Sequence, residues 1–339
     1  MRSFASDNYA GVHPVIMEAI VNANNDHMTS YGDDPVSEEA VELFKEHFGK
    51  DVKVFFMATG TATNTLILKH ITNSWSSVIC TDTAHITVDE CGSTEAIAGV
   101  KLVHADTVDG KLSLSSIKPL LSGRKDVHQS QPSVISITQN TELGTLYTVE
   151  EIKEICDYAH SKGLWVHMDG ARLANAAVAL GVSFKEMTTD CGVDVLSFGG
   201  TKNGCMCAEA AVFINSELGK NFDFIRKQGM QLISKMRYMG AQFKALLSNG
   251  LWIKNATKAN DLASILEQKV RKIKDVTITR PVQANAVFAI IPQEFIEPLQ
   301  AQFPFYVWDE ATGEVRWMTS WSTTEEDINN FVQALKKLI

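Results

Sequence analysis

The chain has 339 residues, of which 45% are hydrophobic and 21% charged, and its formal net charge is −9. This composition excludes an intrinsically disordered chain, and the negative charge argues against a broad nucleic-acid surface. No apolar stretch approaches the ~18 residues needed to cross a bilayer, and the start of the chain has no hydrophobic signal core. The length predicts about two domains.

The cysteine pattern predicts reduced thiols and a cytoplasmic protein. The six cysteines are scattered, with no spacing typical of a disulfide framework: Cys80, Cys91, Cys156, Cys191, Cys205 and Cys207. The last two are one residue apart, but no second cluster follows them, so we expect no metal site.

The first part of the chain predicts helices around one buried strand. Apolar residues of the segment 12–25 fall on one helical face. The segment 37–48 has Ser37 as a plausible cap, acidic residues in its first turn and Gly49 as its end. The expected elements are helices 12–25, 37–48 and 61–71 and the strand 52–57.

The middle of the chain alternates strands with helices. The expected strands are apolar runs at 77–81, 101–104, 133–138, 164–168, 193–197 and 208–214. Thr148 and Glu151 form a capping box at the start of a helix over 148–162. Continuous apolar strands, rather than alternating ones, predict a mostly parallel central sheet covered by helices on both faces.

The last third of the chain predicts a long helix and a smaller α/β unit. We expect one helix over 215–248, ended by Asn249-Gly250. The following elements are helices 260–272 and 325–338 and strands 286–291 and 314–318. We therefore predict a large domain over 1–250 and a small C-terminal domain over 251–339.

The segment 58–64 predicts a phosphate site. A buried strand ends, Gly60 permits a tight turn, and a helix begins at Thr61. Free N–H groups and hydroxyls at a helix start bind anions. On this segment alone an ordinary strand-to-helix turn is the stronger alternative, because the spacings of dinucleotide and nucleotide loops are missing.

Two later strands end at polar residues. Asp169 follows a buried strand and precedes Gly170, and Arg172 comes one short turn later. An acid there can bind a metal, a ribose or a protonated ring nitrogen, and a helix-capping role is the competitor. Lys202 lies in a Gly-Gly turn after the next strand, without other charges around it. A partly desolvated lysine can act as a Schiff-base nucleophile, although an ordinary surface lysine is the default reading of such a turn.

The order of these segments favours one cofactor. His85, in Ala84-His85, lies at a strand-to-helix transition, where an imidazole can cover a flat ring or relay a proton. A phosphate cradle, an imidazole, an acid and a lysine in this order are what a pyridoxal 5'-phosphate site requires. The phosphate needs the helix start, the ring nitrogen needs the carboxylate, and the aldehyde needs the lysine.

The chain resembles the threonine aldolases among the fold-type-I pyridoxal phosphate enzymes, over essentially its whole length. The matching stretches are Phe4-Ala-Ser-Asp-Asn-Tyr-Ala-Gly-Val-His-Pro14, Ser30-Tyr-Gly-Asp-Asp-Pro35, Thr59-Gly-Thr61, Ala84-His85, His167-Met-Asp-Gly-Ala-Arg172 and Ser197-Phe-Gly-Gly-Thr-Lys-Asn-Gly204. Ser234-Lys-Met-Arg237 makes the low-specificity and phenylserine-type branch the most similar one. The resemblance implies an α/β fold of the fold-type-I transferase class.

The resemblance implies roles for residues at the cofactor. Lys202 forms the Schiff base, Asp169 pairs with the pyridine nitrogen and His85 stacks on the ring. Gly60 and Thr61 hold the phosphate. Arg172 and Arg237 are also expected at the cofactor, although Leu232-Ile-Ser-Lys replaces the Gly-rich stretch that many aldolases carry before this second arginine.

The resemblance also implies a substrate site. Ser6, Arg172 and Arg316 would bind the substrate carboxylate, with the N-terminal segment 1–25 contributing to the site. Arg316 lies in an apolar, strand-like stretch, and a charged group there needs an anion, which independently favours this role. His128 aligns with a histidine near the substrate hydroxyl, and an exposed loop histidine is the equally good alternative from the residues alone.

A neighbouring subunit completes the expected site. The resemblance implies a homodimer or homotetramer with sites at the dimer interface. Tyr31 and Arg237 are the residues expected to reach the site from the neighbouring subunit.

The expected reaction is retro-aldol cleavage of L-threonine, L-allo-threonine and phenylserine to glycine and an aldehyde. The arginines fix the carboxylate and so align the Cα–Cβ bond with the ring, and His85, His128 or an ordered water removes the hydroxyl proton. One alternative is another β-eliminating lyase or an aminotransferase with the same cofactor. A further alternative is a non-catalytic, cofactor-binding regulator. We expect a small amino-acid substrate, no nucleic acid and no membrane.

Overall fold

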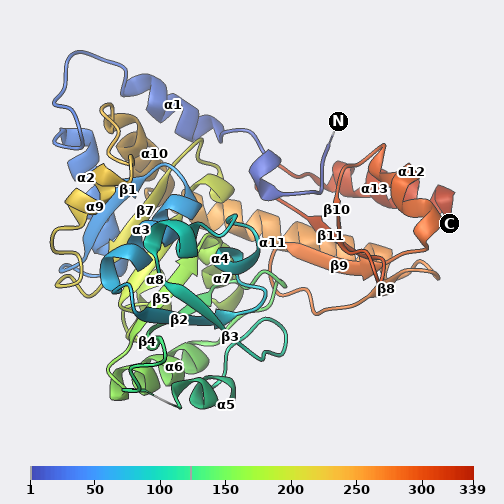
Figure 1. The fold of residues 1–339 in the computed structure, drawn as a ribbon. Helices are drawn as coiled ribbons and strands as arrows, with labels where there is room; N and C mark the ends of the chain where they lie inside the picture. Colours follow the sequence, from blue (N-terminus) through green and yellow to red (C-terminus); the bar gives the residue numbers. More distant parts are fainter. Residues whose placement is uncertain (1, 123) are drawn as a thin grey trace.

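The structure is a computed structural model of the chain and describes residues 2–122 and 124–339 (Figure 1). Within the described part of the chain, no helix is both long and apolar enough to cross a membrane. A large α/β unit holds most of the chain, and a smaller unit formed by the C-terminal elements lies beside it (Figure 1).

A seven-stranded sheet forms the centre of the large unit. Its strands are β1 (Lys53–Met57), β2 (Ser76–Thr81), β3 (Lys101–Ala105), β4 (Gln131–Thr138), β5 (Trp165–Gly170), β6 (Val195–Gly199) and β7 (Glu209–Phe213). They are ordered β1-β7-β6-β5-β4-β2-β3, and only β7 runs antiparallel to its neighbours. The predicted mostly parallel sheet is therefore confirmed. Parallel strands end at one edge of the sheet, so the polar residues after β2, β4, β5 and β6 meet there.

Helices cover this sheet, and those at 14–22, 35–48, 60–71 and 149–161 lie where the sequence predicts them. They are α1 (Pro14–Asn22), α2 (Pro35–Phe48), α3 (Gly60–Ile71), α4 (His85–Val88), α5 (Leu114–Ile117), α6 (Val149–Ser161), α7 (Leu173–Leu180), α8 (Phe184–Met187), α9 (Phe222–Gln228) and α10 (Arg237–Leu247). The predicted capping box of α6 is present. The predicted cap of α2 is wrong: Asp34, not Ser37, is the cap, and its Oδ1 accepts from the Ser37 N–H at 2.9 Å.

The single helix expected over 215–248 is also wrong. The structure has α9 and α10, separated by a segment that includes Gly229 and Met230. A Cβ on Gly229 would lie 2.3 Å from Leu66 Cδ1, and Met230 has φ of +62°. Close packing against α3 and the left-handed backbone therefore end α9. Similarly, α11 (Leu251–Val270) begins nine residues before the expected helix 260–272.

The small unit contains a second, antiparallel sheet. Its elements are β8 (Thr277–Ile278), β9 (Ala286–Ile290), β10 (Tyr306–Asp309), β11 (Glu314–Met318), α12 (Ile296–Gln300) and α13 (Glu325–Leu338). The strand order is β10-β11-β9-β8, with every pair antiparallel. The N-terminal segment joins this unit, because Phe4 N–H donates to Pro304 O and Phe4 O accepts from Met318 N–H, both at 2.8 Å.

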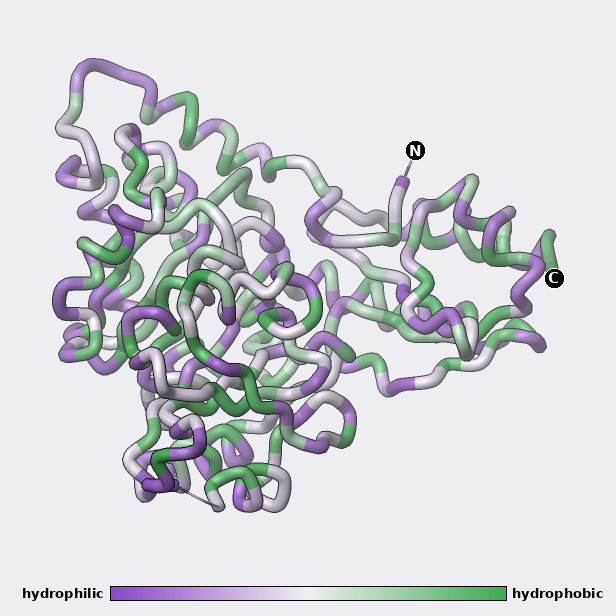
Figure 2. The backbone as a smooth tube through the Cα atoms, viewed as in Figure 1, coloured by the Kyte–Doolittle hydropathy of each residue, from purple (hydrophilic) through white to green (hydrophobic). Residues whose placement is uncertain are grey.

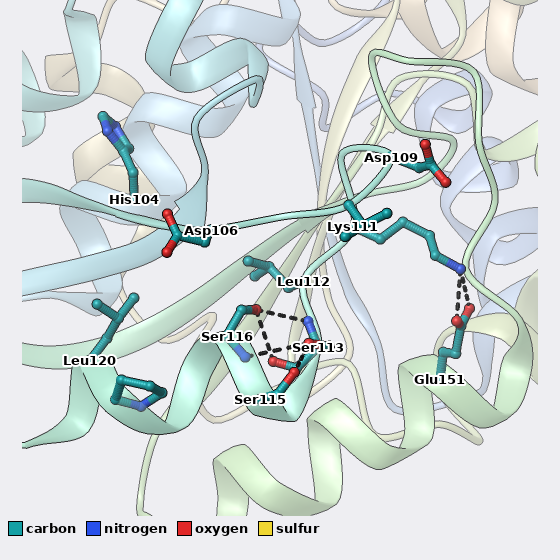
Figure 3. A pocket seen from close by; sticks show the side chains of 12 residues that line it. His104, Asp106, Asp109, Lys111, Leu112, Ser113, Ser115, Ser116, Leu120 and Glu151 are labelled. Carbon is teal, nitrogen blue, oxygen red and sulfur yellow. Dashed lines mark hydrogen bonds and ion pairs between the residues drawn. The ribbon is translucent and has the colours of Figure 1, made fainter. Parts of the chain in front are cut away.

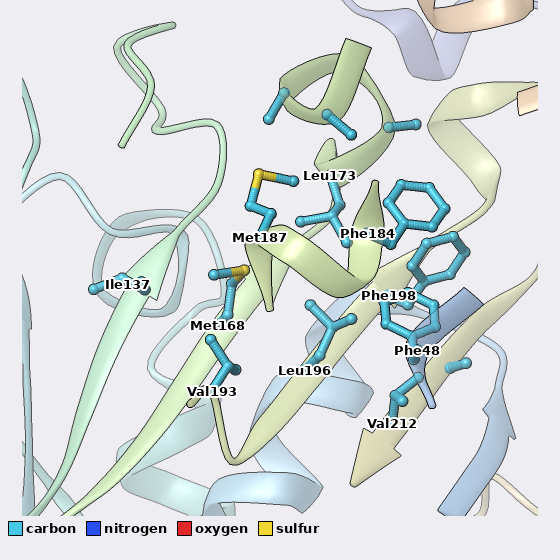
Figure 4. Packing of buried hydrophobic residues seen from close by; sticks show 14 of the residues in the cluster. Phe48, Ile137, Met168, Leu173, Phe184, Met187, Val193, Leu196, Phe198 and Val212 are labelled. Carbon is cyan, nitrogen blue, oxygen red and sulfur yellow. The ribbon is translucent and has the colours of Figure 1, made fainter. Parts of the chain in front are cut away.

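Two main hydrophobic cores hold these units. In the large one, the stacked rings of Phe48 and Phe184 lie 5.3 Å apart beside Leu196 of β6 (Figure 4). The core of the small unit contains Trp317, Phe331 and Phe4. In Figure 2 the central strands are largely hydrophobic, whereas the loop between α1 and α2 is hydrophilic.

The helix α11 contributes to both cores. Its residues Leu251, Trp252 and Ala256 pack in the large core, and Leu262 and Leu266 pack in the small one. Because α11 packs in both cores, it joins the two units; a large domain over 1–250 and a small domain over 251–339 remain our proposal.

Candidate active site

A small cavity opens at the carboxyl edge of the large sheet. It lies between the start of α3, the ends of β4, β5 and β6, and α4. Six of the residues predicted for the site line it: Gly60, Thr61, His85, Asp169, Arg172 and Lys202. Segments up to 142 residues apart in the sequence thus meet in one place.

The start of α3 forms an anion cradle. Thr59 caps the helix, and its side chain accepts from the Ala62 N–H at 3.2 Å. The first N–H groups of a helix have no partner within it, which leaves those of Gly60 and Thr61 for an anion. A Cβ on Gly60 would have no atom within 4 Å, so the space beside it is open.

Asp169, near the end of β5, is held as a buried carboxylate. Its Oδ1 accepts from the Ala171 N–H and its Oδ2 from Asn64 Nδ2, both at 2.9 Å. Burial alone would raise the pKa of Asp169, but the charge of His85, these hydrogen bonds and Lys202 lower it below its usual value. The carboxylate therefore stays ionised and can pair with a protonated ring nitrogen.

Lys202 lies in the short 3₁₀ helix η4 (Thr201–Asn203) directly after β6. Burial and the neighbouring charge of Arg172 lower the pKa of Lys202. This makes its neutral, nucleophilic form more accessible. The turn before it needs glycine, because a Cβ on Gly199 would lie 2.6 Å from the Ala171 backbone oxygen.

His85 is the first residue of α4, and a buried carboxylate orients it. Its Nδ1 lies 2.9 Å from Glu90 Oε1, which also accepts from Asn64 Nδ2 at 2.8 Å. The hydrogen bond with Glu90 raises the pKa of His85. Asn64 therefore links the carboxylate behind the imidazole with that of Asp169.

Arg172 is already paired with an acid of the N-terminal segment. Its Nε and Nη2 donate to the two oxygens of buried Asp7 at 2.7 and 2.9 Å. Burial would raise the pKa of Asp7, but the Arg172 guanidinium and its hydrogen bonds hold that pKa below its usual value. The pair fixes the guanidinium at the cavity wall.

Arg316, on β11, has the opposite environment. Its guanidinium stacks over Trp308 at 4.7 Å, and its nearest hydrogen-bond acceptor is Ala5 O at 3.5 Å. Its Nε is buried with no partner among the described residues. Burial and the charge of Arg172 lower the pKa of Arg316 to about 10. A buried guanidinium without a carboxylate partner favours binding of an anionic ligand.

Five predicted site residues lie outside the cavity wall: Arg316, Ser6, Tyr31, Arg237 and His128. Ser6 Oγ caps the 3₁₀ helix η1 (Asp7–Tyr9), accepting from the Asn8 N–H at 3.2 Å. This helix packs against η4, which carries Lys202.

Tyr31 and Arg237 lie on the surface formed by the α1–α2 loop and the start of α10. The Tyr31 N–H donates to Ser234 O at 2.9 Å, and Arg237 Nη1 donates to Asp26 O at 3.0 Å. Tyr31 is 46% exposed. Neither side chain lines the cavity of its own chain.

His128 is exposed and precedes β4, at the sheet edge opposite the cavity. The eight residues of β4 span roughly 26 Å at about 3.3 Å per residue. Within one chain, His128 therefore does not reach the substrate site.

Sequence reasoning missed Asn64, Asp7, Glu90, Glu142 and Glu209. Four of these line the cavity, and Asp7 contacts it through Arg172. Asp7 and Glu90 belong to segments that the sequence singled out, but neither had a signal of its own. Burial raises the pKa of Glu142 and that of Glu209 to about 7.

A second surface pocket lies beyond the end of β3 (Figure 3). Lys111 and Glu151 face each other across it at 2.7 Å, and Ser113, Ser115 and Ser116 bond among themselves. None of the predicted site residues lines it.

Comparison with known proteins identifies the family of this chain. Residues 3–294 match the family model described as beta-eliminating lyase. A low specificity L-threonine aldolase of Pseudomonas aeruginosa is 41% identical over 99% of this chain and 97% of its own length.

Solved structures agree as well. Threonine aldolase of Leishmania major has a TM-score of 0.94 and 31% identity, covering 100% of this chain and 99% of its own. Aspartate aminotransferase of Thermus thermophilus, 14% identical over 100% of this chain and 95% of its own, shares the fold with a TM-score of 0.70. The predicted fold-type-I class is therefore confirmed, and the chain belongs to the beta-eliminating lyase family and, within it, to the low-specificity L-threonine aldolases.

Proposed function

We propose that this protein binds pyridoxal 5'-phosphate in the cavity and cleaves L-threonine and L-allo-threonine, and also phenylserine, to glycine and an aldehyde. The observation that carries the proposal is one half-buried lysine and one buried aspartate at a single cavity, beside a helix start open to an anion. The family to which the chain belongs supports the same activity.

The residues of the cavity fit this cofactor. The N–H groups of Gly60 and Thr61 would hold the phosphate, and Asp169 would pair with the ring nitrogen. Lys202 would bond to the aldehyde carbon, and His85 would cover the ring. When bound, pyridoxal phosphate supplies an electron sink for negative charge at the substrate α-carbon.

The arginines orient the amino acid. Arg316 has an unpartnered, buried Nε, so it is the stronger candidate for the substrate carboxylate. Arg172, held by Asp7, presents its remaining N–H group to the same anion, and Ser6 lies beside this pair. Fixing the carboxylate determines which bond of the α-carbon would lie perpendicular to the ring. Such positioning can lower an activation barrier by up to ~7–11 kcal/mol.

A base must take the proton of the β-hydroxyl. His85 or an ordered water can do so from within the chain. His128 could take this role only in the cavity of a second copy of the chain, because the cavity of its own chain lies at the opposite edge of the sheet. We propose that Tyr31 and Arg237 likewise act on a neighbouring cavity, the latter near the cofactor, in a homodimer or homotetramer located in the cytoplasm.

The experiment is a product assay with threonine, allo-threonine, phenylserine and serine. We expect an aldehyde and glycine in equal amounts from the β-hydroxy amino acids. Ammonia and a keto acid would instead indicate β-elimination, and an amino-group transfer to a keto acid would indicate an aminotransferase. A protein that binds the cofactor but turns over none of these substrates would indicate the non-catalytic, cofactor-binding regulator.

A further inference from the structure

We propose that Glu142 is the base that accepts the proton of the substrate's β-hydroxyl group, an inference that rests on the proposed function. Glu142 follows β4 and lines the same cavity as Lys202 and His85. No sequence motif pointed to this residue, because no recognised spacing connects it with the other cavity residues.

One oxygen of Glu142 is fixed and the other is free. Oε1 accepts from the His85 N–H at 2.8 Å and from Thr138 Oγ1 at 2.9 Å. Oε2 is buried and has no partner among the described residues. Two bonds on Oε1 anchor the carboxyl group, so that Oε2 is left for a donor that enters with a ligand.

The other carboxylates of the cavity are already engaged. Asp169 accepts from Ala171 and Asn64, and Glu90 accepts from Asn64 and His85. Burial raises the pKa of Glu209, and the neighbouring hydroxyl and N–H groups of Thr201 oppose that effect. Glu142 is therefore the acid of this cavity whose free oxygen is buried and unsatisfied in the described part of the chain.

Two further buried oxygens near the cavity, Asn64 Oδ1 and Asn140 Oδ1, lack partners in the described part of the chain. An amide oxygen can accept a hydrogen bond but cannot hold a proton at neutral pH. His85 is a weaker candidate because Glu90 already bonds its Nδ1. If its ring covers the cofactor, its remaining nitrogen lies at the edge of the stacked ring.

The charge environment suits a base that works near neutral pH. Burial and the nearby charge of Asp169 raise the pKa of Glu142 to about 7, against the opposing effect of its hydrogen bonds. The ionisable groups that face it from the surrounding elements are His85, Cys80, Tyr147, Asp169, Arg172 and Lys202. A base whose pKa matches the working pH is the most effective one.

The step is balanced. Glu142 Oε2 takes the hydroxyl proton, and the O–H bonding pair becomes the second bond of the aldehyde carbonyl. The Cα–Cβ bond breaks, and its electron pair remains on the α-carbon. That carbon then takes a proton from solvent to give glycine, and Glu142 returns its proton to solvent.

The test compares Glu142→Gln and Glu142→Asp with wild type, and exposed Glu150→Gln serves as the control. We expect Glu142→Gln to lower kcat/KM for L-threonine by about 10²–10⁴-fold and to remove the acid limb of the pH profile near pH 7. Glu142→Asp keeps a carboxylate and should retain the limb. Exchange of the glycine α-proton with deuterated water needs no hydroxyl base, so it should stay within a few-fold in both variants.

A second readout does not depend on activity. This readout is carbon NMR of cofactor-free protein that carries carboxyl-labelled glutamate. The Glu142 resonance is assigned by its absence from Glu142→Gln, and it should titrate with a midpoint of about 7. Three results would overturn this inference while leaving the proposed function intact. They are wild-type cleavage rates in Glu142→Gln, equal losses of cleavage and of α-proton exchange, and a Glu142 resonance that titrates near pH 4. If wild-type protein releases no aldehyde, the proposed function fails as well.

Discussion

Two arginines of the same predicted type have different surroundings. Arg172 forms a two-bond ion pair with Asp7, whereas Arg316 has an unpartnered Nε and stacks on an aromatic ring. The motif around Arg172 could not reveal this, because its partner is 165 residues away. The difference makes Arg316 the residue whose charge is free for the substrate.

We predict that Arg316→Lys raises the KM for L-threonine about tenfold or more, with a smaller loss of kcat. A guanidinium grips a carboxylate through two parallel bonds, and an ammonium group cannot reproduce that geometry. Steady-state kinetics with wild type as the control measures both constants. An unchanged KM would show that Arg316 has only a structural role.

We predict that Asp169→Asn lowers turnover by a factor of 100 or more while most of the cofactor stays bound. An amide can still contact the Ala171 N–H, but it carries no charge to keep a ring nitrogen protonated. The phosphate cradle of α3 provides most of the anchoring. Turnover and the cofactor content after gel filtration are measured on the same sample, and near-normal turnover would contradict the role of Asp169.

The sequence predicted the residues of the cavity that belong to local motifs. Gly60 and His85 begin helices, and Asp169 and Lys202 lie at or just after the ends of strands, so their places follow from the parallel sheet. Asn64, Asp7 and Glu142 could not be predicted, because their importance depends on partners from other segments. The hydrogen bonds of Asn64 to both Glu90 and Asp169 exist only once α3 packs beside β5.

At the scale of elements, the turn that carries Lys202 packs against the turn after β5. A Cβ on Gly199 would lie 2.6, 2.8 and 3.0 Å from the oxygen, Cα and carbonyl carbon of Ala171. Backbone atoms cannot rotate away as a flexible side chain can. The absence of a side chain at Gly199 therefore lets Asp169 and Lys202 share one cavity.

We predict that Gly199→Ala lowers the free energy of unfolding by about 1–3 kcal/mol, the usual cost of overpacking, and also lowers activity. Exposed Gly11, where a Cβ would have no atom within 4 Å, provides the matched control Gly11→Ala. Denaturant unfolding of both variants measures the difference. Equal stability of the two variants would show that the turns can separate without cost.

Elements with local end signals were predictable, and those that depend on packing were not. Helix α6 begins at its capping box and β11 has the predicted bounds, because both signals lie within a few residues. The helical composition of 215–248 hid the break at Gly229, which is set by contact with Leu66. The cap of α2 was misplaced because Pro35 at the first helical position makes Asp34 the flanking residue.

At the scale of the whole molecule, the two ends of the chain meet at the site. Phe4 packs in the small core and bonds to both Pro304 and Met318. This contact brings Asp7 to Arg172 and places Arg316 beside them. In the proposed function, the substrate carboxylate would therefore contact parts of both units.

We predict cleavage of L-threonine and L-allo-threonine at comparable rates and no cleavage of D-threonine. The carboxylate clamp and the fixed ring determine which face of the α-carbon is presented, whereas one base contacts the β-hydroxyl. A hydrophobic pocket discriminates by only about 1–3 kcal/mol per methylene. Values of kcat/KM for the three substrates test this. A preference above roughly a thousandfold, about 4 kcal/mol, for one L-epimer would contradict the relaxed reading of the β-carbon.

The central claim is that Lys202 holds the cofactor for aldol cleavage, and borohydride reduction followed by peptide mass spectrometry tests it most directly. We predict that reduction removes the visible absorbance band of the lysine–cofactor Schiff base and stops aldehyde release from L-threonine. The reduced cofactor should then be found covalently attached to Lys202. Lys202→Ala should fold normally but show no Schiff-base absorbance band, no covalently attached cofactor after reduction and no cleavage of L-threonine. Reduced cofactor attached to another lysine, or aldehyde release by Lys202→Ala at the wild-type rate, would contradict the account.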